Sequence, residues 1–321
     1  MRSALAILAI LASRPVAPRA FSNGLEPGTS LGGIQVLQAP ASPRVLIPGA
    51  TFSMGAGEYE LAIGNVLCEK EPLGMLCKAH ELRDDFLARE TPVHSVTITP
   101  FYIDRTEVTV DAYKRCVGAG ACKTPGFPAL DPRYDRPDFP VTHVTWEEAK
   151  DFCRFAGGRL PTEAEWELAA RGEAARAFPW GNVYNPHLIN HGSLAMDPTD
   201  ASDGYAGLAP VGSFKNGATP LGVLDMAGNV SEWVEDRIDQ TPEGLFTPYS
   251  SKAQTNPVAL RGQFHLVRGG SYTSGAHLMR ATARMPAMGE SRRSDIGFRC
   301  VYEQTMPKKE PPPTAKPSPR E

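Results

Sequence analysis

The sequence has no strong excess of charge of either sign and no apolar run long enough to cross a membrane. Its 33 Lys and Arg residues face 36 Asp and Glu residues, for a formal net charge of −3. This balance gives no electrostatic reason to expect a nucleic acid or an anionic lipid as a partner. No stretch reaches the roughly 18 apolar residues that a transmembrane helix needs. We therefore expect no transmembrane segment.

Glycine and proline, in contrast, are abundant. The 30 Gly and 30 Pro in 321 residues exceed average usage and favour turns and long irregular connections. From Phe178 to Gly222 the sequence consists almost entirely of turn-forming residues. A run of that length inside a compact domain usually carries a function or is held in place by a bound ion. We expect a loop-rich fold.

The two ends of the chain differ in composition from its body. Residues 4–12 form a short apolar run behind one positive residue, Arg2, which is the pattern of a secretory signal peptide, placed here at residues 1–23. Residues 24–44 are expected to be a linker, and the charged, proline-rich residues 304–321 a disordered tail. This leaves residues 45–303 as the folded domain and predicts a secreted or periplasmic protein.

The six cysteines form an even set on a chain that we expect to be exported, so disulfides are the default interpretation, although 15 pairings are possible. Cys68 with Cys77, and Cys116 with Cys122, are close enough in the sequence to form local bridges. Those two bridges would leave Cys153 and Cys300 to pair with each other. A zinc site is the alternative use of such residues, but no two of them have CxxC spacing.

Several local patterns predict regular structure. Residues 48–55, 93–99, 101–108, 265–268 and 297–302 have the composition of strands. Apolar spacing predicts a helix up to Gly118 from about residue 110, and two more helices begin with capping boxes, at Thr145 with Glu148 and at Thr162 with Glu165. We interpret the acidic residues of these first turns as partners of the helix dipole rather than as catalytic groups.

Several blocks in this order resemble the signature of the formylglycine-generating enzyme family, also called the sulfatase-modifying factor family. They are Pro140–Trp146 (PVTHVTW), Gly158–Glu167 (GRLPTEAEWE), Phe178–Asn182 (FPWGN), Asp225–Trp233 (DMAGNVSEW), Arg268–Tyr272 (RGGSY) and Gly297–Cys300 (GFRC). The resemblance implies one α+β domain with much irregular structure, a variant of the C-type lectin fold. It also implies a disulfide between Cys153 and Cys300.

The resemblance further implies two calcium sites. The first matches Asn190, His191, Asp203 and Tyr205, and the second matches Asp225, Gly228, Val230 and Glu232. In each set two side chains and two backbone carbonyls would supply oxygens, which suit a hard cation such as calcium. The alternative is that Asp203 and Asn229 are simply turn residues.

The sequence departs from the family at its catalytic block. Members that make formylglycine hold copper(I) with two cysteines just after the Gly-Gly-Ser block, and thiolates are natural ligands for that ion. Here Ser274 stands in the place of the first cysteine, and a shorter loop offers nothing for the second. Ser231 stands where many members have a tryptophan. We therefore do not expect copper at this site.

The same block contains residues for two other kinds of site, a copper site and a serine hydrolase site. His277 and Met279 could in principle hold copper, and Ser271 or Ser274 near His277 could form a hydrolase site. A serine nucleophile needs a base within reach and an acid that orients the base, and closeness in the sequence establishes neither.

Three functions remain as hypotheses. The first is a calcium-stabilised module, expected to be monomeric, that binds a protein, peptide or glycan ligand through its loops. The second is an oxygen-dependent oxidoreductase acting on a cysteine or another small substrate through Ser274, His277 or Glu290. The third is an assembly factor that docks through its proline-rich tail.

Overall fold

The computed structural model describes residues 42–78, 88–193, 195, 197, 200–241 and 246–304. The predicted signal peptide, nearly all of the predicted linker and the predicted tail beyond residue 304 lie outside the described residues. Among those described, no helix is both long and apolar enough to cross a membrane.

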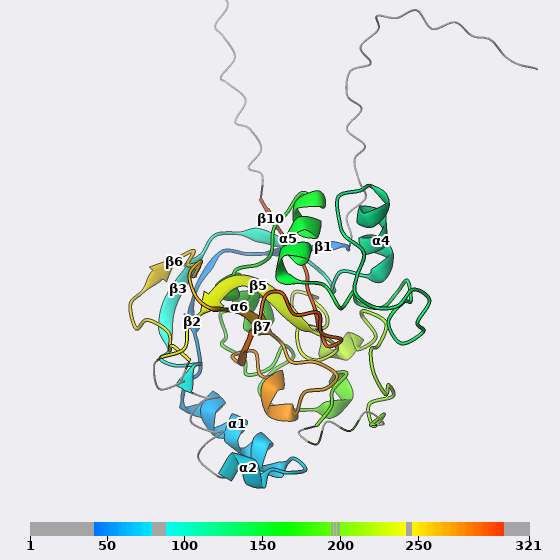
Figure 1. Ribbon diagram of the computed structural model, residues 1–321. Coiled ribbons are helices and arrows are strands. Elements are labelled where there is room, and N and C mark those ends of the chain that lie inside the picture. Colours follow the sequence, from blue (N-terminus) through cyan, green and yellow to red (C-terminus); the bar gives the residue numbers. More distant parts are fainter. Residues whose placement is uncertain are drawn as a thin grey trace, which may run out of the picture. The chain divides into compact units, whose positions relative to one another are not determined.

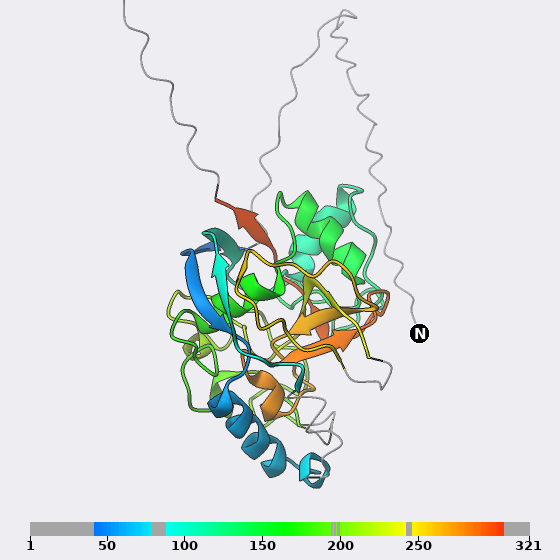
Figure 2. The same cartoon turned by 90° about the vertical axis from the view of Figure 1, so that its left-hand side faces the viewer.

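Strands of the described part form three small sheets (Figures 1 and 2). The first sheet has the order β1 (Arg44–Ile47), β4 (Phe101–Asp104), β10 (Val301–Glu303). The second has the order β2 (Ala50–Met54), β3 (His94–Ile98), β6 (Gln254–Thr255). The third has the order β8 (Arg284–Ala287), β7 (Phe264–Arg268), β5 (Ser231–Ile238), β9 (Ile296–Gly297).

The described helices are short, and long irregular segments connect them. The α-helices are α1 (Glu58–Lys70), α2 (Met75–Lys78), α4 (Val110–Gly118), α5 (Trp146–Phe155) and α6 (Glu163–Arg171). The 3₁₀ helices are η1 (Pro186–Leu188), η2 (Lys215–Gly217) and η3 (Ala276–Met279). This is the mixed α+β, loop-rich architecture that the sequence predicts.

The three helices predicted from spacing and capping boxes are confirmed. In α5 the Thr145 hydroxyl accepts a hydrogen bond from the Glu148 backbone N–H, and the Glu148 carboxylate accepts one from the Thr145 N–H at 3.0 Å. Thr162 and Glu165 repeat this arrangement at the start of α6. Each box satisfies two backbone donors that would otherwise lack partners, which is why so local a signal fixes the helix start.

Several boundaries differ from the predictions. The predicted strand over 101–108 ends at Asp104, and the predicted strand over 297–302 is split between β9 and β10. Helix α1 was not predicted. Only Glu60 and Gly64 of α1 are buried, and Ile63 and Leu67 are partly buried against the core, so the apolar stripe of this helix is short.

The third sheet is covered on both faces. Trp233 of β5 and Val267 of β7 belong to a core that also contains apolar residues of α4 and α5. The next residues along the same strands, Val234 and Leu266, belong to a second core that contains Trp166 of α6 and the inner faces of the other two sheets. Because successive side chains of a strand point to opposite faces, β5 reads as a continuous buried run rather than an alternating one.

All six cysteines form disulfides, in the pairing that was expected. Cys68 bonds Cys77, Cys116 bonds Cys122, and Cys153 of α5 bonds Cys300. The third bridge closes a loop of 147 residues between two fully buried positions. It joins α5 to the chain segment between β9 and β10.

Candidate functional site

The loop singled out by the sequence, residues 269–280, connects β7 to β8 and contains η3. A network of hydroxyl groups fills its first half. The Ser271 Oγ lies 3.1 Å from the Ser274 Oγ and 3.0 Å from the Thr273 Oγ1, and the Thr273 hydroxyl donates to the Asp295 Oδ2 at 3.1 Å. Arg293 in turn donates from its Nε to the Asp295 Oδ1 at 2.8 Å. Three hydroxyls, a carboxylate and a guanidinium thus occupy the part of the loop where formylglycine-forming members have their two copper-binding cysteines.

These residues line a hollow of about 180 Å³. Ser274, Thr273, Arg293 and Asp295 contribute polar groups, and Ser231 forms part of the wall as the sequence indicated. The remaining lining residues are mostly apolar, among them Val267, Leu278, Met285, Pro286 and Ile296. Since every cysteine of the chain is in a disulfide, the hollow contains no thiol.

The other residues considered for chemistry at this loop have separate environments. His277 and Met279 are buried in η3. Burial, and then the positive charges of Arg280 and Arg89, lower the pKa of His277 to about 4, so its imidazole is neutral at physiological pH. Glu290 is exposed and exerts its electrostatic effect on His265, not on this loop.

The geometry around Ser271 differs from that of a serine hydrolase site. The carboxylate nearest to Ser271 is Asp295, with its Oδ2 3.5 Å from the Ser271 Oγ, and that carboxylate is bound by Arg293. In a serine hydrolase an imidazole stands between the serine and the carboxylate. At Ser271 the carboxylate of Asp295 lies beside the serine hydroxyl directly, and Arg293 lies beyond it.

The first predicted calcium set comes together in space. The Asp203 carboxylate accepts hydrogen bonds from the backbone N–H groups of His191, at 2.7 Å, and Tyr205, at 2.9 Å. Asn190 is buried, and its Nδ2 donates to the Gly207 carbonyl at 2.8 Å. Its Oδ1 is buried with no hydrogen-bond partner. A buried amide oxygen without a hydrogen-bond partner is the kind of ligand that a hard cation uses, and the two Asp203 oxygens accept backbone hydrogen bonds in the same segment.

The described residues contain no cluster of three or more His, Cys, Asp or Glu side chains placed to hold a metal ion. The first predicted set contributes just one such side chain acting through its own oxygens, Asp203. Its other cation ligands would be one side-chain amide and two backbone carbonyls, which are not among the side chains counted in such a cluster.

The second predicted set fits a cation less well. Both oxygens of Glu232 are engaged, by the Arg299 guanidinium at 2.6 and 2.7 Å and by the Trp166 Nε1 at 2.8 Å. Asp225 accepts from the Gly212 N–H at 2.6 Å and lies beside Glu107. Burial, and then the Asp225 charge, raise the pKa of Glu107 well above its usual range. The Glu107 Oε1 accepts a hydrogen bond from the Asn229 Nδ2 at 3.0 Å, and its Oε2 is buried without a hydrogen-bond partner.

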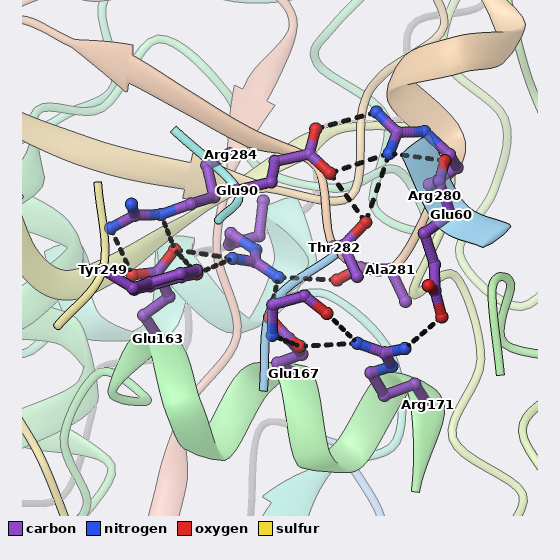
Figure 3. A network of polar contacts seen from close by, with 12 residues as sticks. Glu60, Glu90, Glu163, Glu167, Arg171, Tyr249, Arg280, Ala281, Thr282 and Arg284 are labelled. Carbon is purple, nitrogen blue, oxygen red and sulfur yellow. Dashed lines mark hydrogen bonds and ion pairs between the residues drawn. The ribbon is translucent and has the colours of Figure 1, made fainter. Parts of the chain in front are cut away.

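Two buried arginines hold the ends of the 269–280 loop, and Figure 3 labels the one at its end, Arg280. At its start, Arg268 donates to Glu163 at 2.5 Å, to Glu167 at 2.8 Å and to the Ala281 carbonyl at 2.6 Å. At its end, the Arg280 guanidinium donates to both carboxylate oxygens of Glu90, each at 2.7 Å. The loop is thus fastened to α6 and to the segment before β3.

Sequence reasoning missed this ionic network. It interpreted the acidic residues in the first turn of α6 as dipole partners, but Glu163 is buried and paired with Arg268, and Glu167, which it did not single out, is buried and paired with the same arginine. Glu167 also pairs with Arg171 within α6. Two glutamates four residues apart, at positions 163 and 167, followed by Arg171 would have been the available signal, since all three share one helix face.

The 180 Å³ hollow adjoins two larger ones, and Ser193 lines all three. A hollow of about 640 Å³ lies against α1, and we call it the α1 hollow. A hollow of about 580 Å³ contains Tyr134, Phe139 and Tyr272, and we call it the aromatic hollow. The three together are called the trough below. They give this surface three neighbouring hollows, one mostly apolar, one aromatic and one with hydroxyl groups.

Comparison with known proteins gives a consistent result. The family model described as "Sulfatase-modifying factor enzyme 1-like domain" matches residues 35–304. A protein named formylglycine-generating enzyme from Thermomonospora curvata is 32% identical, over 83% of this chain and 95% of its own length. A Bos taurus protein named inactive C-alpha-formylglycine-generating enzyme 2 is 33% identical over 51% of this chain and 50% of its own.

Among solved structures, that of PvdO from Pseudomonas aeruginosa superposes with a TM-score of 0.59. It covers 81% of this chain and 94% of its own, at 26% sequence identity. Relatives named as enzymes and relatives named as inactive therefore both resemble this chain.

Proposed function

The chain belongs to the sulfatase-modifying factor family, and from this premise we propose that it is a calcium-stabilised binding module and not a copper-dependent formylglycine-generating enzyme. The observation that carries the proposal is the hydroxyl network at Ser271, Thr273 and Ser274, bonded to Asp295. Copper(I) prefers thiolate ligands, and all six thiols of this chain are in disulfides elsewhere.

The calcium ion would be held by the first predicted set. Asn190 and Asp203 would contribute side-chain oxygens, and His191 and Tyr205 their carbonyls. When bound, calcium supplies a fixed positive charge that holds loops together. The unpartnered Asn190 Oδ1 supports this assignment. The second set, from Asp225 to Glu232, is the weaker prediction because Arg299 already neutralises Glu232.

The ligand would occupy the trough. Its neighbouring hollows are lined by irregular segments together with α1 and strands of the third sheet, which is covered on both faces. Loops on such a scaffold can change their surface without disturbing the core. The disulfides agree with an oxidising compartment, so we propose that the predicted signal peptide exports the protein to the periplasm or the medium.

A second candidate function is an oxidoreductase of the same family. The specific observation in its favour is that η3 contains His277, whose imidazole is neutral, two residues from Met279. A neutral imidazole and a thioether are both possible ligands for copper(I).

Elemental analysis by mass spectrometry, on protein purified from an oxidising compartment without chelator, separates the two functions. About one calcium per chain without copper or iron supports the binding module, and the Asn190→Ala variant should lose that calcium. Stoichiometric copper or iron, together with oxygen consumption on a cysteine peptide that His277→Ala abolishes, would favour the oxidoreductase. Loss of partner capture on deleting residues 304–321 would instead favour docking through the tail.

A further inference from the structure

We propose that another hollow of this protein, separate from the trough, binds a small aliphatic amine or guanidine through Asp236 and His94. This hollow, called the polar hollow below, has a volume of about 290 Å³. Its wall comes from β2, β3, β5, β8, the start of α6 and residues between 247 and 259. It shares no lining residue with the three hollows of the trough, so binding here is independent of the function proposed above.

Asp236 of β5 is a buried carboxylate without a counter-ion. It lines the polar hollow and is 6% exposed, and no lysine or arginine among the described residues pairs with it. Its Oδ2 accepts a hydrogen bond from the Glu163 backbone N–H at 2.7 Å, and its Oδ1 accepts one from the Ala259 N–H at 2.8 Å. Each carboxylate oxygen can accept one more hydrogen bond. Because an unpaired buried charge is costly, a cation in the hollow would stabilise the ionised form of Asp236.

The neighbouring arginines are already neutralised by glutamates. Arg284 of β8, for example, donates to both Glu163 oxygens, at 2.6 and 2.8 Å (Figure 3). The whole ionic network around it joins three arginines to three glutamates, namely Arg171, Arg268, Arg284, Glu60, Glu163 and Glu167. The charges of this network balance, and Asp236 is not one of its members.

Arg237 also lines the polar hollow, but its guanidinium group lies on the other side of the sheet. The Arg237 Cζ is 5.6 Å from the centroid of the Trp146 ring, which belongs to the core formed with α4 and α5. Asp236 and Arg237 are successive residues of β5, and successive side chains of a strand point to opposite faces. Arg237 therefore does not compensate Asp236.

His94 of β3 adds a second acceptor to the polar hollow. It is 5% exposed, and its Nδ1 lies 3.1 Å from the Pro92 carbonyl oxygen. If Nδ1 donates its proton to that carbonyl, the Nε2 of the neutral ring is an acceptor. Nothing in the described part of the chain donates to Nε2. A carboxylate and a ring nitrogen with free acceptor capacity suit the N–H donors of an ammonium or guanidinium group.

The size and the remaining lining of the polar hollow indicate a small ligand with a short carbon chain. Small-molecule sites usually measure about 300 to 1,000 Å³, so this hollow is at the lower end of the range. Its apolar lining residues include Met54, Ile238, Pro248, Pro257 and Val258. These residues can contact an aliphatic chain next to the charged group.

The wall between residues 247 and 259 is held in place without a ligand. The Tyr249 hydroxyl donates to the Glu163 Oε1 at 3.0 Å, and the Tyr249 backbone N–H donates to the Thr91 carbonyl at 2.8 Å. The Ala259 N–H is bound by Asp236 itself. A preformed site binds its ligand with little loss of conformational entropy.

The test is isothermal titration calorimetry of the full-length, oxidised protein with butylammonium and butylguanidinium, and with butyrate as the anionic counterpart. We expect both cations to bind and butyrate not to bind. Asp236→Asn and His94→Phe should each weaken binding by about tenfold or more, since each removes an acceptor from a charged ligand. The matched controls Glu147→Gln and His187→Phe change an exposed carboxylate and an exposed histidine and should leave the affinity unchanged.

Proton release provides a readout that needs no variant. The charged groups that face Asp236 are Glu163 of α6 and Arg284 of β8, and His94 of β3 lines the same hollow. Burial, and then the Glu163 charge, raise the pKa of Asp236 to about 7, so about half of the molecules carry this proton at pH 7. A bound cation favours the carboxylate. Binding at pH 7 should therefore release about half a proton per ligand, and the affinity should decrease as the pH falls below 7.

Three results would overturn this assignment. They are failure of both cations to bind, equal affinity for the wild type and for a folded Asp236→Asn or His94→Phe variant, and binding without proton release in buffers of different ionisation enthalpy. A metal ion that saturates the hollow and is not displaced by the amines would overturn the ligand class as well. The calcium content that tests the proposed function depends on other residues, so it is unaffected by any of these results.

Discussion

Replacing Glu90 by glutamine should strongly destabilise the protein, because Glu90 is the counter-ion of a fully buried arginine. Both Glu90 oxygens accept from Arg280 at 2.7 Å, and one also accepts from the Thr282 hydroxyl at 2.7 Å (Figure 3). Glu90 is 1% exposed and Arg280 is 0% exposed. The substitution keeps the shape of the side chain but leaves the Arg280 charge buried without compensation.

Removing one partner of a buried ion pair costs about 3 to 5 kcal/mol. Glutamine still offers one oxygen to Arg280, so we expect the low end, about 3 kcal/mol, against a typical total stability of about 5 to 15 kcal/mol. Guanidinium unfolding of the oxidised protein, followed by tryptophan fluorescence, measures this loss. As a control, Asp151→Asn breaks the exposed pair with Arg154 and should cost less than about 0.5 kcal/mol.

A cost below about 1 kcal/mol for Glu90→Gln would refute this reasoning, since an exposed pair would then explain it equally well. The double variant Glu90→Leu with Arg280→Met provides a second test. Replacing a buried pair by apolar groups is often neutral, so the double variant should be more stable than the sum of its two single variants predicts.

Three further predictions concern acid, disulfides and calcium. Burial, and then the Arg237 charge, lower the pKa of His265 to about 4, and both of its ring nitrogens are buried without hydrogen-bond partners. As the pH falls, the unfolded chain binds a proton at His265 near pH 6.5, whereas the folded protein binds it only near pH 4. The free energy of unfolding therefore decreases between pH 6.5 and pH 4, by at most about 3 kcal/mol. The His265→Leu variant should lose correspondingly less in unfolding curves measured at pH 7 and pH 4.5, and equal losses would contradict the assignment. Replacing Cys153 and Cys300 by Val and Ala should cost about 5 kcal/mol in the chain-entropy model, against about 2 kcal/mol for the short Cys116–Cys122 loop; a larger loss of Tm for the short loop would be the opposite result. Calcium chelation should lower the Tm of the native protein and leave that of Asn190→Ala unchanged, and an equal fall in both would remove Asn190 from the site.

What the sequence could predict of the fold was local. Two examples are the capping boxes at Thr145 and Thr162 and the β-branched run of β3. Each depends on residues that are only a few positions apart, so the sequence pattern alone predicts it. Helix α1 was not predicted because its apolar stripe is short, with Ile63 and Leu67 only partly buried, and contacts at Tyr59 and Gly64 also hold it.

The sequence singled out the loop after β7 as a candidate site, which stays a prediction, and it did not predict what holds that loop in place. The block from Arg268 to Arg280 was located by resemblance, and the serine cluster lies within it. Its anchoring depends on pairs such as Arg280 with Glu90, separated by 190 residues. A pairing across that distance follows from the tertiary fold and leaves no periodic trace in the sequence.

Because Arg268 and Arg280 hold the two ends of the loop between them, part of that loop can be replaced without changing where its ends lie. Arg268 and Arg280 fix where this segment leaves and re-enters the core. Positions 272–274 are partly exposed, whereas Ser271 and Met279 are buried and would have to be kept. A library randomised at positions 272–274 should therefore retain the folded framework in most members while presenting new surfaces, which makes this chain a scaffold for selecting binding proteins.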